Sequence, residues 1–114
     1  MTGSTTISRS IEDLENLGGL RDTDIANIAD VPKATVSHWR TGASKPRPRN
    51  ELILSDLHYL IRRLQEYYTS AEIRAWLYAR HPQLDGERAI DLIHAGRRVE
   101  MLRALRRFDS DGYL

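Results

Sequence analysis

Apolar residues recur at three- and four-residue steps along almost the whole of this 114-residue chain. The first run consists of Ile7, Ile11, Leu14 and Leu17, and Gly18 then ends the first expected helix. This spacing places apolar side chains on one face of an α-helix. No run alternates with a period of two for long enough to predict a β-strand. The chain is therefore predicted to be all-α, with about seven helices.

Proline and glycine set the boundaries of the short helices in the first third. Pro32 interrupts the helical pattern, because proline disfavours helical geometry at the preceding residue and is well suited to begin the next helix. Thr23 can cap the short helix before this break. The helix after it is expected over residues 33–40, with its end at Gly42.

The longest helix is expected in the middle of the chain, over residues 51–68. It follows the segment ASKPRPRN, whose two prolines predict a non-helical linker and a domain boundary at residues 43–50. Thr69 and Glu72 then have the spacing of a capping box, which predicts another helix start. Two further helices are expected after the loop HPQLDGERA, over residues 89–95 and 97–108.

Composition limits the kinds of chemistry and partner that the chain can have. Apolar residues make up 40% and charged residues 29%, as in globular proteins. The absence of cysteine excludes disulfides and thiolate chemistry. The polar start has no signal-peptide pattern, and no stretch is apolar enough to span a membrane, so a cytoplasmic protein with no membrane partner is expected. The net charge of +1 means that binding to an anionic partner would depend on local clusters of charge.

Residues 24–42, DIANIADVPKATVSHWRTG, resemble the helix-turn-helix of Xre-type DNA-binding proteins, the phage repressor and Cro-like group. Two short helices that cross at a steep angle need apolar contacts. The residues at those positions are Ile25, Ala26, Val31, Val36 and Trp39. Trp39 shares a face with Val36, which favours a place in the core over base stacking. Asp30 stands where the family usually has glycine, and aspartate tolerates the left-handed conformation of this turn better than most residues.

The outer face of the second helix in this motif, and the segment after it, carry many hydrogen-bond donors. Between Val31 and Asn50 there are five lysine or arginine residues and no aspartate or glutamate. Such donors suit phosphate oxygens and base edges in a major groove, and counterion release would make the binding depend on salt. The predicted DNA-binding residues are Lys33, Thr35, Ser37, His38, Arg40, Lys45, Arg47 and Arg49. The alternative is a small helical domain whose basic face is only solvated.

A homodimer is also expected, because one helix-turn-helix reads only one half-site of an operator. The helix expected at residues 51–68 has apolar residues on more than one side. This wide stripe would serve the core of the chain itself, a subunit interface, or both. Operator DNA and a second copy of the chain are therefore predicted partners.

The last third of the chain has a second recognisable pattern. Residues 76–105, WLYARHPQLDGERAIDLIHAGRRVEMLRAL, resemble the toxin-binding domain of the Xre/MbcA/ParS family of antitoxins. The residues that carry the likeness are Trp76, Leu77, His81, Pro82, Leu84, Gly86, Ala89, Asp91, Leu92, Gly96, Val99 and Leu102. The chain departs from the family at Ala89, where proline is common, and at Arg88.

The family also has an Xre-like helix-turn-helix ahead of this domain, so the resemblance covers about the whole chain in the right order. In length and layout the chain is similar to mycobacterial members. The resemblance implies a DNA-binding domain over residues 1–48. A helical toxin-binding domain, which would also contribute to dimerisation, is implied over residues 49–114.

The resemblance further implies an antitoxin that binds a RES-domain toxin, an enzyme that consumes NAD. In the family the C-terminal end of the antitoxin reaches the NAD pocket of the toxin, and the complex represses its own operon. The resemblance implies that the following residues bind the toxin: Arg103, Arg106, Arg107, Phe108, Asp109, Ser110, Asp111, Gly112, Tyr113 and Leu114. We hypothesise that the acidic end mimics the phosphates of a dinucleotide, and that a tyrosine ring fills an aromatic slot.

Alternatives to this interpretation differ in what the C-terminal end does. A stand-alone transcriptional regulator with a helical dimerisation domain would not need the segment DSDGYL. Terminal disorder and a solvated arginine-rich helix face would also account for this end of the chain.

The sequence has no pattern typical of an enzyme. The four histidines, His38, His58, His81 and His94, lack metal-type spacing, and no Gly-rich phosphate loop or nucleophile elbow is present. We therefore predict no catalysis, no cofactor and no metal site.

Overall fold

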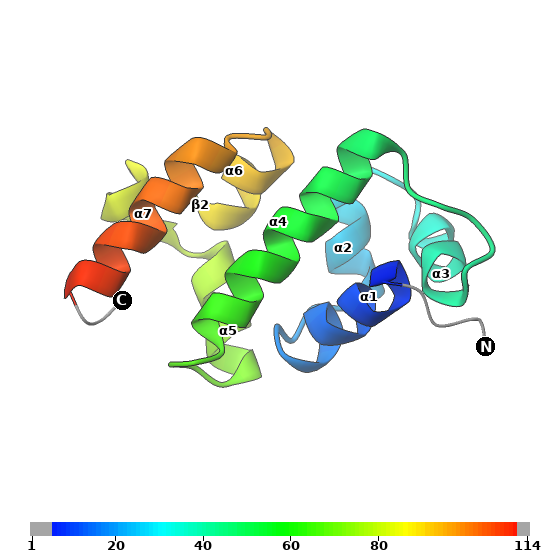
Figure 1. The fold of residues 1–114 in the computed structure, drawn as a ribbon, viewed down its shortest axis with the longest axis horizontal. Coiled ribbons are helices and arrows are strands. Elements are labelled where there is room, and N and C mark those ends of the chain that lie inside the picture. Colours follow the sequence, from blue (N-terminus) through cyan, green and yellow to red (C-terminus); the bar gives the residue numbers. More distant parts are fainter. Residues whose placement is uncertain (1–5, 112–114) are drawn as a thin grey trace.

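Helices dominate the computed structural model, which describes the backbone of residues 6–111 and the side chains of residues 6–106 (Figure 1). The α-helices of the described part are α1 Thr6–Asn16, α2 Asp22–Ala29, α3 Lys33–Thr41, α4 Pro48–Leu64, α5 Ser70–Tyr78, α6 Ala89–His94 and α7 Arg98–Asp111. The predicted all-α class is confirmed. None of the described helices is both long enough and apolar enough to cross a membrane.

The segment predicted as a loop after α5 contains a small hairpin. The strands β1, Arg80–His81, and β2, Glu87–Arg88, pair antiparallel, and a 3-10 turn, Pro82–Leu84, lies between them. The chain reverses at Asp85 and Gly86, which both have positive φ values, of 56° and 81°. Strands of two residues are too short to produce an alternating pattern, which is why the prediction of a plain loop was wrong.

The longest helix begins and ends earlier than predicted. Pro48, expected to belong to a non-helical linker, is the first residue of α4. Proline is well tolerated there, because its fixed φ suits the helix and the N–H that it lacks would have no intrahelical partner. The helix ends at Leu64, whose carbonyl accepts the N–H groups of Tyr67 and Tyr68 at 2.9 and 3.0 Å in the following turn.

The predicted capping box at the start of α5 is confirmed. The hydroxyl of Thr69 accepts the backbone N–H of Glu72 at 3.3 Å, and the carboxylate of Glu72 accepts the N–H of Thr69 at 2.9 Å. Two backbone donors that the helix itself leaves unpaired are thereby satisfied. The pKa of Glu72 is lowered, because the backbone and hydroxyl of Thr69 both bind its charged form.

The central helix α4 joins the two halves of the molecule. In Figure 1 it runs diagonally across the front, with α1–α3 on one side and α5–α7 on the other. The apolar side chains on its inward side are buried. They belong to Ile53, Leu54, Leu57, Leu60, Ile61 and Leu64. The same apolar core reaches Trp39 of α3 and Met101 of α7, so it continues across the predicted boundary at residues 43–50. The division into domains 1–48 and 49–114 stays a prediction.

The turn after α1 needs a glycine because it touches α4. A Cβ atom on Gly18 would lie 2.6 Å from Cδ1 of Ile61 and 2.8 Å from the carbonyl oxygen of Leu14. Both distances are shorter than real Cβ atoms show, so a side chain here would displace the end of the Ile61 side chain and strain the backbone at the end of α1. The glycine that ends the first helix in the sequence pattern therefore also leaves room for the side chain of Ile61 from α4.

Candidate functional surfaces

The predicted helix-turn-helix is present in α2 and α3. Asp30 lies in the left-handed region, with φ 60° and ψ 52°, at the position where the family usually has glycine. The N–H of Val31 bonds to the carbonyl of Ala26 at 2.9 Å, which closes the end of α2. Aspartate is one of the few residues apart from glycine that adopt this conformation readily. The turn geometry expected from the sequence is confirmed.

The packing of α3 fixes which of its side chains face outward. Val36 and Trp39 are buried, with exposed fractions of 0% and 2%, so the prediction that Trp39 belongs to the core is confirmed. Lys33, Ser37 and His38 are exposed. Thr35, which was also predicted to contact DNA, is half-buried. The exposed side chains therefore share the side of α3 that faces away from the core.

Arg40 is not on this outer face. Its Nη1 lies 2.9 Å from Oε1 of Glu15 in α1, and its Nη2 bonds to the carboxylate of Asp22 in α2. Its backbone carbonyl also accepts the hydroxyl of Ser8 at 2.8 Å. The expectation that Arg40 lies on the outer face was wrong, because the two carboxylates hold its guanidinium against the other helices. Its assignment to DNA contact stays a prediction.

The segment between α3 and α4 places its basic residues near the turn of the motif. Lys45, Arg47 and Arg49 are exposed, and together with Thr35 they line a cavity of about 470 Å³. The cavity is open beside residues 29–32 of the turn. Arg49 also donates from Nη2 to the carbonyl of His94, at 3.0 Å. The structure thus brings four of the predicted DNA-binding residues together and links one of them to α6.

A buried carboxylate that the sequence analysis missed joins α2 to α5. Asp24 accepts the backbone N–H of Arg21 at 2.8 Å, the hydroxyl of Tyr78 at 2.6 Å, and a hydrogen bond from Arg74. Burial raises the pKa of Asp24, but the bonds from Arg74 and Tyr78 outweigh it, and the pKa is lowered overall. Burial and the bond to Asp24 raise the pKa of Tyr78 to about 12.

A second polar contact connects α2 with α6. Nδ1 of His94 lies 2.8 Å from the carbonyl oxygen of Ile28, so this nitrogen donates the hydrogen. His81 likewise bonds through Nε2 to the carbonyl of Trp76 at 2.8 Å, and the centres of the two rings lie 4.4 Å apart. Both histidines thus have structural partners, and the helix-turn-helix is attached to the second half of the chain.

The final helix, α7, is anchored at its start by two arginines. Arg97, just before the helix, contacts Glu87 of β2 at 2.6 Å and also pairs with Glu100. Arg98 lies 2.7 Å from Asp56 of α4, whose side chain is only 8% exposed. These two of the five arginines between residues 97 and 107 therefore hold the helix in place.

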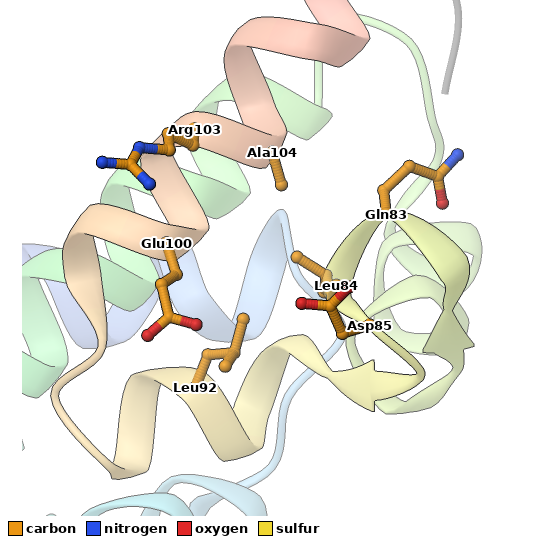
Figure 2. Close-up of a pocket in the computed structure, with 7 residues that line it drawn as sticks. All are labelled: Gln83, Leu84, Asp85, Leu92, Glu100, Arg103 and Ala104. Atoms are coloured by element: carbon orange, nitrogen blue, oxygen red, sulfur yellow. The ribbon is translucent and has the colours of Figure 1, made fainter.

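Further along α7, apolar and basic residues lie on different sides. Met101, Ala104 and Leu105 are buried, whereas Arg103 and Arg106 are exposed. A cavity of about 350 Å³ lies where α7 meets α6 and the hairpin. Figure 2 shows its lining, in which the guanidinium of Arg103 points away from the leucines of the hairpin and α6. The two arginines are thus available at the surface for a partner.

The remaining predicted toxin-binding residues fall at the end of the chain. The helical backbone continues to Asp111, beyond the predicted end at residue 108. The side chains of Arg107, Phe108, Asp109, Ser110 and Asp111 lie outside the described residues, as do Gly112, Tyr113 and Leu114 entirely. Of this predicted site, the structure therefore places only Arg103 and Arg106.

These features define a predominantly helical protein in which a helix-turn-helix is joined through one long helix to a mainly helical C-terminal half. No family model matches the chain. In sequence it is similar to the probable mycobacterial cidal antitoxin Rv3188 of Mycobacterium tuberculosis, with 28% identity over 97% of this chain and 99% of that protein. In fold it is similar to a chain in the crystal structure of the M. tuberculosis MbcT-MbcA toxin-antitoxin complex, with a TM-score of 0.77, 21% identity and 94% of each chain covered. The resemblance to MbcA-like antitoxins that the sequence predicted is confirmed.

Proposed function

We propose that this chain is an antitoxin that binds a RES-domain, NAD-degrading toxin and holds it inactive. The observation that carries the proposal is the similarity to a probable antitoxin along nearly the whole of both chains. The aligned region covers both the helix-turn-helix and the C-terminal helices of this chain. A fold shared with a chain of a toxin-antitoxin complex supports the same role. An antitoxin acts by binding, which agrees with the prediction that the chain is not an enzyme.

We further propose that the C-terminal end of α7 contacts the toxin and blocks its NAD pocket. The anchoring of this helix by Arg97 and Arg98 supports the proposal, because a helix fixed at its start can present its other end in a constant direction. The exposed Arg103 and Arg106 would lie at the edge of the contact. The residues from Arg107 to Leu114 would complete it.

The helix-turn-helix is proposed to bind operator DNA as part of a homodimer, so that the antitoxin represses its own operon in the cytoplasm. The exposed Lys33, Ser37 and His38 of α3, and the basic segment beside them, support this role. In Figure 1, α3 and α7 lie at opposite ends of the long axis of the molecule. One chain would therefore have room for DNA and toxin at the same time.

The test is NAD turnover by the cognate RES-domain toxin in the presence of the full chain or of a chain that ends at Phe108. We expect the full chain to inhibit and the shortened one to bind at least about tenfold more weakly, a loss of about 1.4 kcal/mol. Equal inhibition by both would contradict the role of the tail. Absence of inhibition by either would contradict the antitoxin proposal and favour the stand-alone regulator. Circular dichroism of both chains controls for folding.

A double exchange, Asp109→Asn and Asp111→Asn, tests the phosphate-mimic hypothesis without shortening the helix. If the carboxylates face a basic pocket, the exchange should weaken inhibition, and the effect should shrink as salt is added. Exchange of Ser110→Ala between them is the matched control. Full inhibition by the double variant would contradict the mimicry while leaving the antitoxin role intact.

A further inference from the structure

The first turn of α4 has backbone N–H groups that the helix itself leaves unpaired. Pro48 begins the helix, and the N–H of Glu51 donates to the carbonyl of Arg47 at 2.9 Å. The N–H groups of Arg49 and Asn50 precede this bond, so neither has a partner within the helix. In the described part of the chain, the side chain of Arg47 does not cap this turn either. A helix end of this kind carries a partial positive charge.

The side chain of Asn50, in the same turn, is a buried amide without a protein partner. The residue is only 9% exposed. In the described part of the chain no other group hydrogen-bonds to this amide, and no unpaired polar side-chain atom is fully enclosed. The amide therefore reaches the cavity that Asn50 lines, which is the one of about 470 Å³ beside the turn of the helix-turn-helix. We call it the α4 cavity. A buried amide is costly to leave unpaired, so its position points to a ligand.

The rest of the lining of the α4 cavity is mainly basic. Its charged residues are Lys45, Arg47, Arg49 and Asp30. All four are exposed at the rim, where three cations outnumber one carboxylate. The half-buried Thr35 adds a hydroxyl from the first turn of α3. Hydrogen-bond donors and positive charge thus surround the amide of Asn50.

We propose that the α4 cavity binds a phosphate group, with the amide of Asn50 and the unpaired N–H groups of the first turn of α4 as its donors. A phosphate offers several acceptor oxygens, which match these donors, and its negative charge is favoured at a helix N-terminus. Lys45 and Arg47 would add charge-assisted contacts from the rim. Asp30 opposes the binding only weakly, because water screens a carboxylate at the surface.

Two sources can supply the phosphate group, the backbone of DNA and a free phosphorylated compound. The cavity borders α3 at Thr35 and Trp39. In Figure 1, α3 and the N-terminal end of α4 lie at the same end of the molecule, so DNA bound by α3 would pass close to the cavity. The cavity also has the volume of a small-molecule site. The DNA source rests on the proposed operator binding, whereas the phosphate site itself does not.

The first test is an NMR titration of the isotope-labelled full chain with inorganic phosphate, compared with sodium chloride at the same ionic strength. We expect the side-chain amide of Asn50 and the backbone N–H of Arg49 to shift with phosphate only. Asn50→Asp should weaken phosphate binding by at least about tenfold, or 1.4 kcal/mol, because like charges then meet. An aspartate is favourable in the first turn of a helix, so this variant should fold. The matched control is Asn16→Asp, at an exposed position at the end of α1, and it should bind phosphate unchanged.

The second test measures binding to double-stranded DNA of random sequence by fluorescence anisotropy, because phosphate contacts do not depend on sequence. If DNA supplies the phosphate, Asn50→Asp should weaken this binding by about tenfold, through the same repulsion. Asn16→Asp should change it little. Inorganic phosphate should then compete with DNA more strongly than chloride does at the same ionic strength.

The two tests together separate the sources. Shifts with inorganic phosphate, with DNA affinity unchanged by Asn50→Asp, would uphold the site and assign it to a free phosphorylated compound. Weaker DNA binding by this variant without such shifts would assign it to the DNA backbone. Neither response, in variants that circular dichroism shows to be folded, would overturn the proposal. Absence of DNA binding by every chain would contradict the proposed operator binding, and the phosphate titration alone would then decide whether the site exists.

Discussion

The helices α3 and α7 both carry basic residues and are both proposed to contact a partner, but they are held in the molecule in different ways. The packing of α3 depends on Val36 and Trp39, and its arginine pairs with carboxylates of α1 and α2 in the same half of the chain. The start of α7 is attached by ion pairs to α4 and to the hairpin. Helix α3 is thus held by elements of the first half of the chain, whereas Arg98 attaches α7 to the central helix α4.

The partners of the two arginines also differ in burial. The side chain of Asp56, which pairs with Arg98, is 8% exposed, whereas that of Glu15, which pairs with Arg40, is 52% exposed. A carboxylate that loses its partner costs more when water cannot reach it. Basic residues on a helix that binds a partner therefore divide into those that hold the helix and those that remain at the surface. Arg98 and Arg40 both hold their helices, and the loss of Arg98 should cost more stability because its partner is more deeply buried.

The largest effect should come from Trp39→Ala, which removes the apolar anchor of α3. The side chain is 2% exposed, and deletion of a buried tryptophan costs roughly 3–5 kcal/mol through lost burial and the cavity left behind. Urea denaturation would measure the loss. His38→Ala, on the exposed side of the same helix, is the matched control and should change stability by no more than about 0.5 kcal/mol. Similar values for the two variants would contradict the anchoring of α3 by Trp39.

An intermediate effect is expected from Arg98→Gln, which breaks the anchor of α7. It leaves the carboxylate of Asp56 buried without its cation, at a cost of about 1–2 kcal/mol, since Arg98 is half-exposed and water can partly replace it. Arg103→Gln, on the exposed side of α7, should leave stability nearly unchanged and weaken toxin binding instead. In an Asp56→Asn background the cost of Arg98→Gln should fall, and additive losses would contradict the pairing.

Much of the fold follows from local patterns in the sequence. The helices, the left-handed Asp30 and the capping box at Thr69 all depend on residues within a few positions of each other. The place of Trp39 in the core also followed from the face that it shares with Val36. These features could be predicted because local geometry decides them.

The features that could not be predicted depend on residues far apart in the chain. Arg40 pairs with carboxylates 25 and 18 residues earlier, and Asp24 bonds to side chains 50 and 54 residues later. Helical periodicity alone predicts that such residues lie on the exposed polar face, because the local sequence does not show the distant partners that contact them. The prediction that Pro48 belongs to a non-helical linker was wrong for a different reason. Proline interrupts the interior of a helix, but it is well tolerated at the first position of one.

The smallest expected effect is a difference in DNA binding between variants of the two cationic side chains of α3, Lys33 and Arg40. If Lys33 contacts a phosphate, Lys33→Met should weaken operator binding and reduce the slope of log K against log salt by about 0.9. Arg40→Met should leave that slope unchanged, because its guanidinium is held by Glu15 and Asp22, and should cost stability by up to about 1 kcal/mol. Binding measured over a series of salt concentrations, at temperatures where both variants are folded, would show the difference. A reduced slope for Arg40→Met would mean that the arginine leaves its carboxylates to reach DNA, so that the division between holding and contacting residues would fail at α3.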